Sequence, residues 1–187
     1  MKPTIILNSL LLSFCLFQAT SSLAQGSLEE LAPEEYFDFW LGSWELTWED
    51  SDGTLARGTN QIERILNQRV IREQFNAVSG AYEGYTGESY SVYQAASGTW
   101  KQTWVDNSGG YLDFTGEFDG DRRMFTRTAL NPEGEQSHQR MVFYDITDDS
   151  FTWDWELSVD DGETWELRWR IQYERSDNGE DSPDSGS

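Results

Sequence analysis

The sequence is poor in cysteine and in histidine. Its 187 residues contain one cysteine, Cys15, and one histidine, His138. One cysteine cannot close an intramolecular disulfide, so the protein must be stable through its core alone. One histidine cannot supply a zinc site built from several histidines. The Gly-x-Ser-x-Gly pattern of a nucleophilic serine is missing as well, so we assign no catalytic residue and no metal ligand from the sequence.

Basic residues are also scarce. Thirteen Lys and Arg residues stand against 34 Asp and Glu residues, which gives a formal net charge of −21. Such a surface repels phosphate backbones and anionic lipid headgroups, so we expect neither a nucleic-acid partner nor a membrane surface as partner. The composition is typical of a soluble secreted protein, and it gives no indication of the oligomeric state.

The first 24 residues are typical of a signal peptide. Lys2 is a minimal positive region, residues 5–19 are largely apolar, and residues 22–24 (Ser-Leu-Ala) end in small side chains at the positions that a signal peptidase reads. The apolar run is too short for a confident membrane span. We therefore expect a secreted or periplasmic protein. The expected segments are a signal peptide over 1–24, an acidic lead over 25–32, one barrel domain over 33–175 and a disordered acidic tail over 176–187.

Long amphipathic helices are not expected, because no segment after Leu41 has a convincing 3.6-residue hydrophobic period. Residues 37–48 read Phe-Asp-Phe-Trp-Leu-Gly-Ser-Trp-Glu-Leu-Thr-Trp. The first half of this stretch follows Pro33 and predicts a short helix over 33–41. The second half alternates, which places Trp44, Leu46 and Trp48 on one face of a strand. We expect the helix to plug one end of a barrel that this strand opens.

Short segments of alternating polarity recur at close and fairly even spacing as far as Arg175. Turn signals such as Asp119-Gly120 separate them, and Asn67-Gln68 predicts a tight hairpin. The pattern indicates about ten strands after Ser43. Short strands joined by short turns are typical of an up-and-down barrel or a sandwich, and of these we expect an all-β fold with a single antiparallel β-barrel.

Several polar side chains are expected on the inner, apolar faces of these strands. Trp100, Gln102 and Trp104 share one face, and Glu73 falls on the more apolar face of its strand. A mostly apolar interior with a few polar groups is what a ligand cavity needs. Alternatively, these groups bond to one another or to buried water inside a filled core. The candidate ligand-binding residues are Glu73, Trp100, Gln102, Trp104, Asn60 and Tyr93.

Residues 158–165 read Ser-Val-Asp-Asp-Gly-Glu-Thr-Trp and fit the Asp-box pattern, Ser-x-Asp-x-Gly-x-Thr-Trp. Sialidases carry several such boxes as structural hairpins, so one copy predicts a turn and is no sign of glycosidase activity. Residues 165, 167, 169, 171 and 173 (Trp, Leu, Trp, Ile and Tyr) make an apolar face on the strand that follows. If Ser158 lies opposite Thr164, the pairing predicts Trp153 against Trp169 on the inner face and Asp154 against Arg168 outside.

Gly42-x-Trp44 at the start of the first strand resembles the calycin superfamily, which includes lipocalins and fatty-acid-binding proteins. In that group a first-strand Trp closes one end of the barrel beneath a basic residue of the last strand. The resemblance implies that Arg175 is the matching residue here, with Arg170 as a second choice. Some barrels related to this class ligate haem through a histidine, but His138 lies among polar neighbours, so we expect a solvated side chain and no haem.

A longer series of motifs is similar to a secreted bacterial calycin-like family of unknown function, from Phe37 to Arg175. That family implies a barrel and supplies no established reaction. Arg170 and Ile171 depart from the Asp-Gly expected shortly before the final Tyr. The motifs of the series are residues 37–44, Gly58-x-Asn60-x-Ile62, Gly87-x-Ser89, residues 100–106 (Trp-Lys-Gln-Thr-Trp-Val-Asp), the Asp box and residues 173–175 (Tyr-Glu-Arg).

Three functions remain open from the sequence. The first is a binding protein that holds a small apolar or aromatic molecule in the barrel. The second is an enzyme that uses a buried Glu73 as an acid or base. The third is a barrel with a filled core that acts through its surface. A cavity with Glu73 at its wall would favour the first two over the third.

Overall fold

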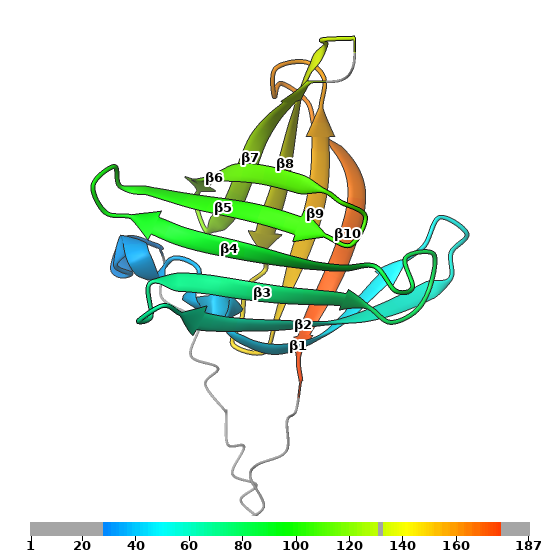
Figure 1. Ribbon diagram of the computed structural model, residues 1–187, viewed down its shortest axis with the longest axis horizontal. Coiled ribbons are helices and arrows are strands. Elements are labelled where there is room, and N and C mark those ends of the chain that lie inside the picture. The colour runs from blue at the N-terminus through cyan, green and yellow to red at the C-terminus, as the bar shows by residue number, and fades with distance from the viewer. Residues whose placement is uncertain (1–27, 131–132, 177–187) are drawn as a thin grey trace, which may run out of the picture.

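The computed structural model describes residues 28–130 and 133–176, which form a closed antiparallel barrel of ten strands (Figure 1). The predicted signal peptide over 1–24 and all of the predicted tail except Ser176 lie outside these ranges. Within them, no helix is long and apolar enough to cross a membrane. The strands are β1 (Gly42–Glu49), β2 (Leu55–Ile65), β3 (Val70–Ala77), β4 (Thr86–Gln94), β5 (Thr99–Asp106), β6 (Tyr111–Asp119), β7 (Arg122–Leu130), β8 (Gln136–Tyr144), β9 (Ser150–Ser158) and β10 (Glu166–Arg175).

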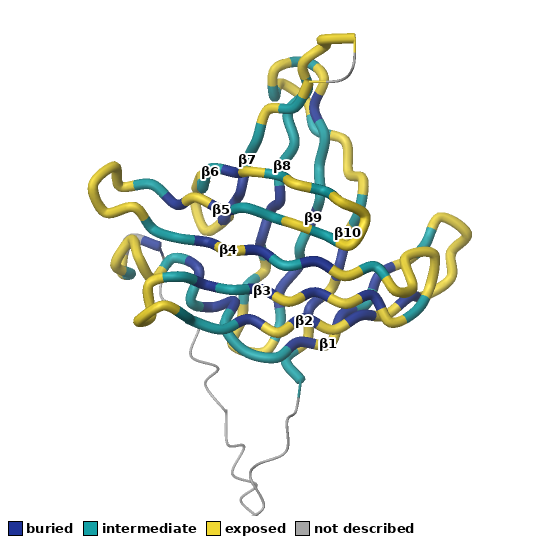
Figure 2. The backbone as a smooth tube through the Cα atoms, in the orientation of Figure 1, coloured by how far each residue is buried: buried dark blue, intermediate teal, exposed yellow. Residues whose placement is uncertain are grey.

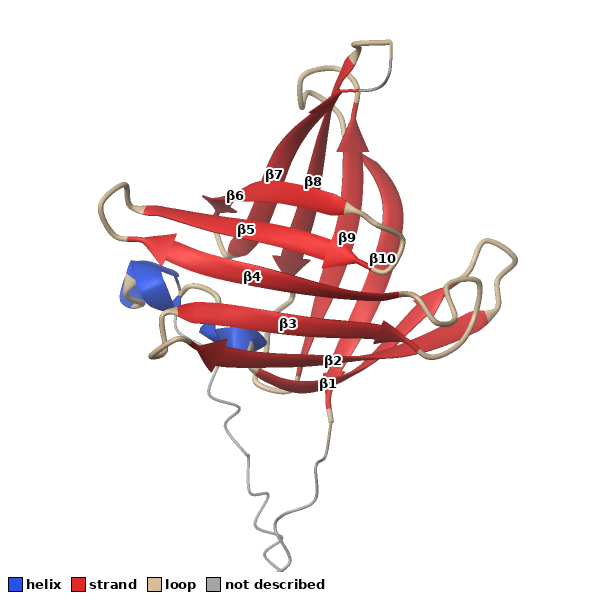
Figure 3. Ribbon diagram, in the orientation of Figure 1, coloured by secondary structure: helices blue, strands red, loops and turns tan. Residues whose placement is uncertain are grey.

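Among the described residues, three short helical turns lie at one end of the barrel, and residues 37–40 plug it. The turns are the 3-10 turns η1 (Leu28–Glu30), η2 (Pro33–Glu35), which has no buried residue, and η3 (Asp38–Trp40). The short helix predicted over 33–41 is therefore present as η2 and η3, separated at Phe37, where the backbone leaves the helical region. Phe37, Phe39 and Trp40 are all buried. Figure 3 shows these turns at one end of the strands β2–β4.

The plug is packed with aromatic rings. Phe37 stacks on Phe125 with 4.4 Å between ring centroids, and it meets Trp100 and Phe143 edge-on at 5.1 and 5.9 Å. Trp100 also donates its Nε1–H to the Pro33 carbonyl oxygen at 2.8 Å. The buried residues alternate with exposed ones along β1–β3, as the dark blue and yellow segments of Figure 2 show.

The predicted closure of the barrel by Trp44 and a last-strand arginine is confirmed. The Arg175 guanidinium carbon lies 4.3 Å from the centroid of the Trp44 ring, and Nη1 of Arg175 donates to the Leu41 carbonyl oxygen at 3.0 Å. Gly42 has φ 124°, and a side chain there would collide with the same guanidinium. The glycine of Gly-x-Trp therefore leaves room for the arginine that covers the tryptophan.

Two ladders of the barrel are paired mainly toward the plugged end. Among the described residues, the β1–β10 ladder covers only Trp44–Thr47 of β1, and the β6–β7 ladder covers only Thr115–Asp119 of β6. In Figure 1, β1–β6 run across the view and β7–β10 cross them, so the two groups diverge away from the helical turns. This divergence leaves room inside the barrel at the end opposite the plug.

The β2–β3 hairpin is longer than predicted. Ile65 pairs with Val70, so the loop is Leu66–Arg69 and not the two residues Asn67-Gln68. Leu66, Asn67 and Gln68 all have positive φ, between 47° and 64°. A two-residue hairpin favours glycine in its turn, and this loop has none. The longer loop closes instead through the Arg69 N–H, which donates to the Ile65 carbonyl oxygen at 3.2 Å.

The predicted register of the β9–β10 hairpin is wrong by two residues. Trp153 lies opposite Ile171, Trp155 lies opposite Trp169, and Asp154 lies opposite Arg170. One residue of the difference arises at the turn and the other at a β-bulge between Leu167 and Trp169. Because the two shifts add to an even number, Trp153 still faces the interior, as predicted.

The bulge also divides the apolar face predicted for β10. Trp169, Ile171 and Tyr173 line the interior, but Leu167 is 44% exposed. Trp165 lies in the turn, where its ring is 3.8 Å from the Arg140 guanidinium carbon. Arg170, not Arg168, is the partner of Asp154, through two hydrogen bonds of 2.7 Å. The predicted ion pair was expected to be exposed, but only its arginine is accessible to solvent, because the Asp154 side chain is only 4% exposed.

Candidate functional site

An aromatic cavity of about 230 Å³ occupies the end of the barrel opposite the plug. Strand alternation brings its lining together from six strands and one loop. Its described lining residues are Glu73, Phe75, Tyr85, Trp104, Leu112, Phe114, Met141, Trp153, Trp155, Trp169, Ile171 and Tyr173. Eight of these twelve are aromatic, and Glu73 is the only carboxylic acid among them. The cavity is therefore an apolar space with one acidic group on its wall.

Glu73 belongs to a buried hydrogen-bond network between the cavity and the plug. Its carboxylate accepts from Asn60 Nδ2 at 2.7 Å and from Ser89 Oγ at 2.6 Å. Asn60 Nδ2 also donates to the Tyr173 hydroxyl oxygen at 3.2 Å, and Gln102 Nε2 donates to Ser89 Oγ at 3.4 Å. These groups bond mainly to one another, which is the arrangement expected for polar side chains inside a barrel.

Burial raises the pKa of Glu73 from its ordinary value of 4.5 to about 7, although the bonds from Ser89 and Asn60 oppose the shift. Desolvation disfavours the charged carboxylate, which explains the direction. Burial and the nearby Glu73 raise the pKa of Tyr173 well above its usual value. Near neutral pH the cavity wall therefore carries a carboxyl group in both protonation states and a tyrosine that keeps its proton.

Within the described part of the chain, two buried acceptor atoms of the network have no hydrogen-bond donor beside them. Asn60 Oδ1 and Gln102 Oε1 have no hydrogen-bond partner among the described residues. If the Asn60 amide turns over, its oxygen can accept from the Tyr173 hydroxyl and from a protonated Glu73. Each protonation state of Glu73 thus has an arrangement of Asn60 that suits it.

The structure separates the six candidate residues of the sequence into three layers. Glu73 and Trp104 line the cavity. Asn60 and Gln102 lie in the polar network and do not line the cavity. Trp100 lies against the plug, and Tyr93 lies beside it with ring centroids 5.9 Å apart. Strand β5 therefore runs from the plug at Trp100, through the network at Gln102, to the cavity at Trp104.

Most of the cavity wall was not among those candidates. The inward faces of β9 and β10 were visible in the sequence as alternating aromatic residues, so Trp153, Trp155 and Trp169 could have been chosen. The missing information was which end of each strand the plug fills. Counting along each strand from the plugged end would have separated Trp100 from Trp104.

Asp106 supports the aromatic wall at its outer edge. Its Oδ2 accepts from the Tyr85 hydroxyl at 3.0 Å and from Trp104 Nε1 at 3.1 Å. The backbone N–H of Gly110 is the main cause that lowers the Asp106 pKa, so this carboxylate stays charged. A fixed negative charge therefore orients two of the cavity rings.

His138 lies away from the cavity, on β8 at the hairpin next to the Asp box. Its Nε2 is 3.4 Å from Asp161 Oδ1, and its Nδ1 is 3.4 Å from Thr128 Oγ1. It does not line the cavity. A haem held by His138 would therefore lie outside the space that the barrel encloses.

Comparisons with known proteins reach no further than the barrel. No protein-family model matches the chain, and no curated protein matches it. Among solved structures, the protein Rv2717c from M. tuberculosis is similar over 79% of this chain and 99% of its own, at 14% identity and a TM-score of 0.47. A de novo designed fluorescence-activating β-barrel is similar over 76% and 98%, at 13% identity and a TM-score of 0.40.

Proposed function

We propose that this protein binds a small, largely apolar or aromatic molecule in the cavity. The observation that carries the proposal is the cavity itself, with eight aromatic residues and one buried acid on its described wall. A dry engineered cavity of about 150 Å³ holds benzene, so about 230 Å³ suits a substituted ring. Trp169 contributes to this wall, and its buried Nε1–H has no partner among the described residues.

The cavity favours binding over the filled-core hypothesis, in which the barrel acts only through its surface. The same geometry supports a calycin-like assignment as part of this proposal, since Trp44 lies beneath Arg175 at the closed end. The cavity then corresponds to the ligand space of a barrel that is open at its other end. Two residues depart from the family pattern. Arg170 forms an ion pair with Asp154 on the outer face, and Ile171 lines the cavity.

Native mass spectrometry of protein purified from its own host tests the proposal. We expect a bound small molecule in the wild type. Leu112→Trp places a large ring into the cavity and should remove the bound mass, whereas the control Leu130→Trp changes a residue that is 70% exposed and should retain it. Equal retention by both variants would show that the molecule binds elsewhere.

A second candidate is an enzyme that uses Glu73 as a general acid or base. The observation that favours it is the Glu73 pKa of about 7 at a cavity wall, because a catalytic acid or base works best with a pKa near the working pH. Incubating the co-purified molecule with wild type and with Glu73→Gln separates the candidates. Conversion by wild type alone, with binding retained in the variant, supports catalysis. Unchanged ligand in both samples supports binding alone.

Export to the periplasm or the medium is also part of the proposal and is based on the signal-peptide pattern of residues 1–24. The mature protein should then begin at Gln25. Mass spectrometry of the intact protein from its host measures this directly, and a retained N-terminal segment would contradict it.

A further inference from the structure

The polarity of the cavity wall is unusual for a site that binds only apolar molecules. The wall combines aromatic rings with a carboxylic acid, and it includes no Lys, Arg or His among the described lining residues. An apolar ligand gains nothing from Glu73, and the charged form of this buried group lacks a cationic partner among the described residues, although it accepts two hydrogen bonds. The group is therefore informative about what the cavity accommodates.

The rings are arranged as a box. Trp153 and Trp169 meet at 88°, and Phe75 and Trp169 meet at 82°. The Arg127 guanidinium carbon lies 5.9 Å from the centroid of the Phe114 ring, so that ring already has a cation of the protein beside it. Together with the other aromatic residues of the wall, these rings surround the cavity. The face of an aromatic ring carries negative charge density and attracts a cation within about 6 Å of its centroid.

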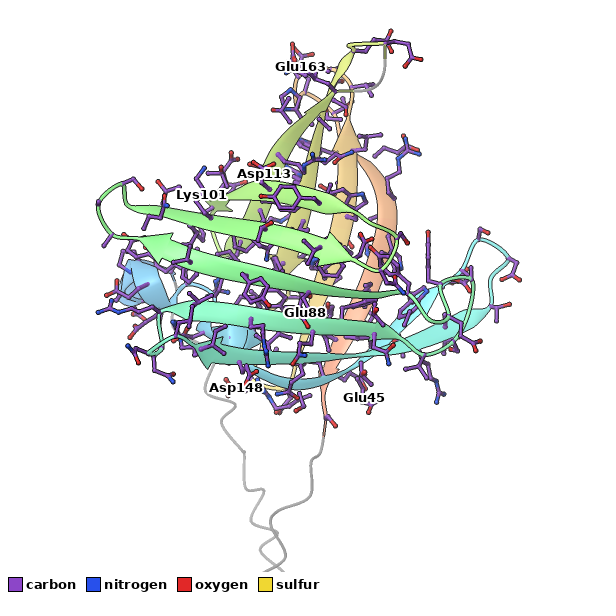
Figure 4. All side chains as sticks on the ribbon, viewed as in Figure 1. Glu45, Glu88, Lys101, Asp113, Asp148 and Glu163 are labelled. Carbon is purple, nitrogen blue, oxygen red and sulfur yellow. The ribbon has the colours of Figure 1, made fainter. Side chains whose placement is uncertain are left out.

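Asp106 strengthens this attraction. It accepts hydrogen bonds from Tyr85 and from Trp104, so both donors are polarised toward their rings. The exterior adds a weaker field of the same sign, with 34 acidic residues in the chain against 13 basic ones. Figure 4 shows acidic side chains such as Glu45, Glu88 and Asp113 distributed over the outside of the strands. A cation is thus attracted at long range by the surface and at short range by the wall.

We infer that the ligand of this cavity is a small organic cation, an aryl or alkyl ammonium, whose charged nitrogen lies against the aromatic box beside Glu73. The inference rests on the proposed binding function and names the chemical class of its ligand. The carboxylate supplies the counter-charge, and the rings replace the water that the ammonium loses. Quaternary ammonium groups are recognised in this way by aromatic cages.

Proton release provides a signature of this pairing. Burial raises the pKa of Glu73 to about 7, and a cation beside the carboxyl group would favour the charged form. The other titratable groups that interact with Glu73 are Tyr173 and Tyr85, whose raised pKa values keep them neutral over this range. Binding at about pH 6 should therefore release about one proton from Glu73, and binding well above pH 7 should release almost none.

The test uses two probes of nearly the same shape, phenyltrimethylammonium and its neutral isostere tert-butylbenzene, titrated against tryptophan fluorescence. We expect the cation to bind about tenfold tighter or more. Glu73→Gln should remove most of that preference. The matched control Glu45→Gln removes the same charge from the exposed outer face of β1 and should retain it. Calorimetry in two buffers of different ionisation enthalpy measures the released proton.

Each outcome has a distinct meaning. Equal affinity for the two probes overturns the cation inference and leaves the proposed apolar site standing. A cation preference that survives Glu73→Gln, or that releases no proton at pH 6, overturns the pairing with Glu73. Failure of both probes to bind folded protein contradicts the proposed function and the inference with it.

Discussion

The two ends of this barrel use the same kinds of side chain to opposite effect. At the plugged end, Phe37 has ring contacts with Phe39, Trp100, Phe118, Phe125 and Phe143, and it is fully buried. At the other end, an equally aromatic wall surrounds a cavity of about 230 Å³. The helical turns fill the first end, and the divergence of β1 from β10 widens the second. Aromatic content alone therefore does not decide whether a barrel interior is solid or hollow.

The largest expected effect compares two buried phenylalanines. Phe37→Ala should destabilise the protein by about 4 kcal/mol, because a close-packed plug cannot collapse around the space left. Phe114→Ala at the cavity wall should cost about 2 kcal/mol, since its surroundings are already hollow on one side. Urea unfolding of both variants measures the difference. Equal losses would show that the two ends are packed alike.

The next effect is the pH dependence of stability caused by Glu73. The folded protein retains a proton on Glu73 between pH 4.5 and about 7, where the unfolded chain releases it. This contribution is full below about pH 4.5 and is lost as the pH rises through 7. Relative to Glu73→Gln, the wild type should therefore lose about 3 kcal/mol of stability between pH 4 and pH 8.

Unfolding of both proteins across that range tests the sign as well as the size. Taking the difference cancels the contributions of the other acidic groups. The wild type could instead become more stable relative to the variant as the pH rises. That result would mean that the surroundings stabilise the Glu73 carboxylate and that burial does not control its pKa.

The third prediction concerns Arg175, which covers Trp44 at the closed end of the barrel. Arg175→Met keeps an apolar stem over Trp44 but removes the charge over the ring and the hydrogen bonds to Leu41 and Asp148. We expect a loss of about 2 kcal/mol. The control is Arg168→Met, on the same strand, where an exposed pair with Glu166 should contribute little. Thermal unfolding measures the stability of the two variants. Equal losses of stability would contradict the proposed role of Arg175 in closing the barrel.

The smallest effect uses two glycines on inward faces. A Cβ at Gly116 would approach the Trp100 Cβ at 2.6 Å, and a Cβ at Gly87 would collide with the Trp104 ring. Trp104 can move into the cavity, whereas Trp100 is held by the plug. We expect Gly116→Ala to cost about 1 kcal/mol more than Gly87→Ala. Only Gly87→Ala should weaken probe binding in a fluorescence titration, because the displaced Trp104 ring makes the cavity of this variant smaller.

The closed end of the barrel could be predicted from the sequence. The alternation of Trp44, Leu46 and Trp48 indicated the first strand and its inner face. The resemblance carried by Gly42-x-Trp44 implied a closure by Arg175, with Arg170 as the second choice. The size of the cavity could not be predicted, because it depends on where β1 and β10 separate, and that follows from pairing across the whole chain. The partner of Trp153 was missed because the turn and the bulge each shift the register by one residue, and no glycine or proline marks the bulge.

The bulge on β10 has a consequence for changes in chain length. In a regular strand, one inserted or deleted residue turns every later side chain to the opposite face. Between Leu167 and Trp169 the chain already carries one residue more than the partner strand. A chain lacking Arg168 would join these two residues in a regular ladder and still place Trp169 opposite Trp155. The hairpin thus has one position where its length can change by a single residue while the ring order of the cavity wall is kept.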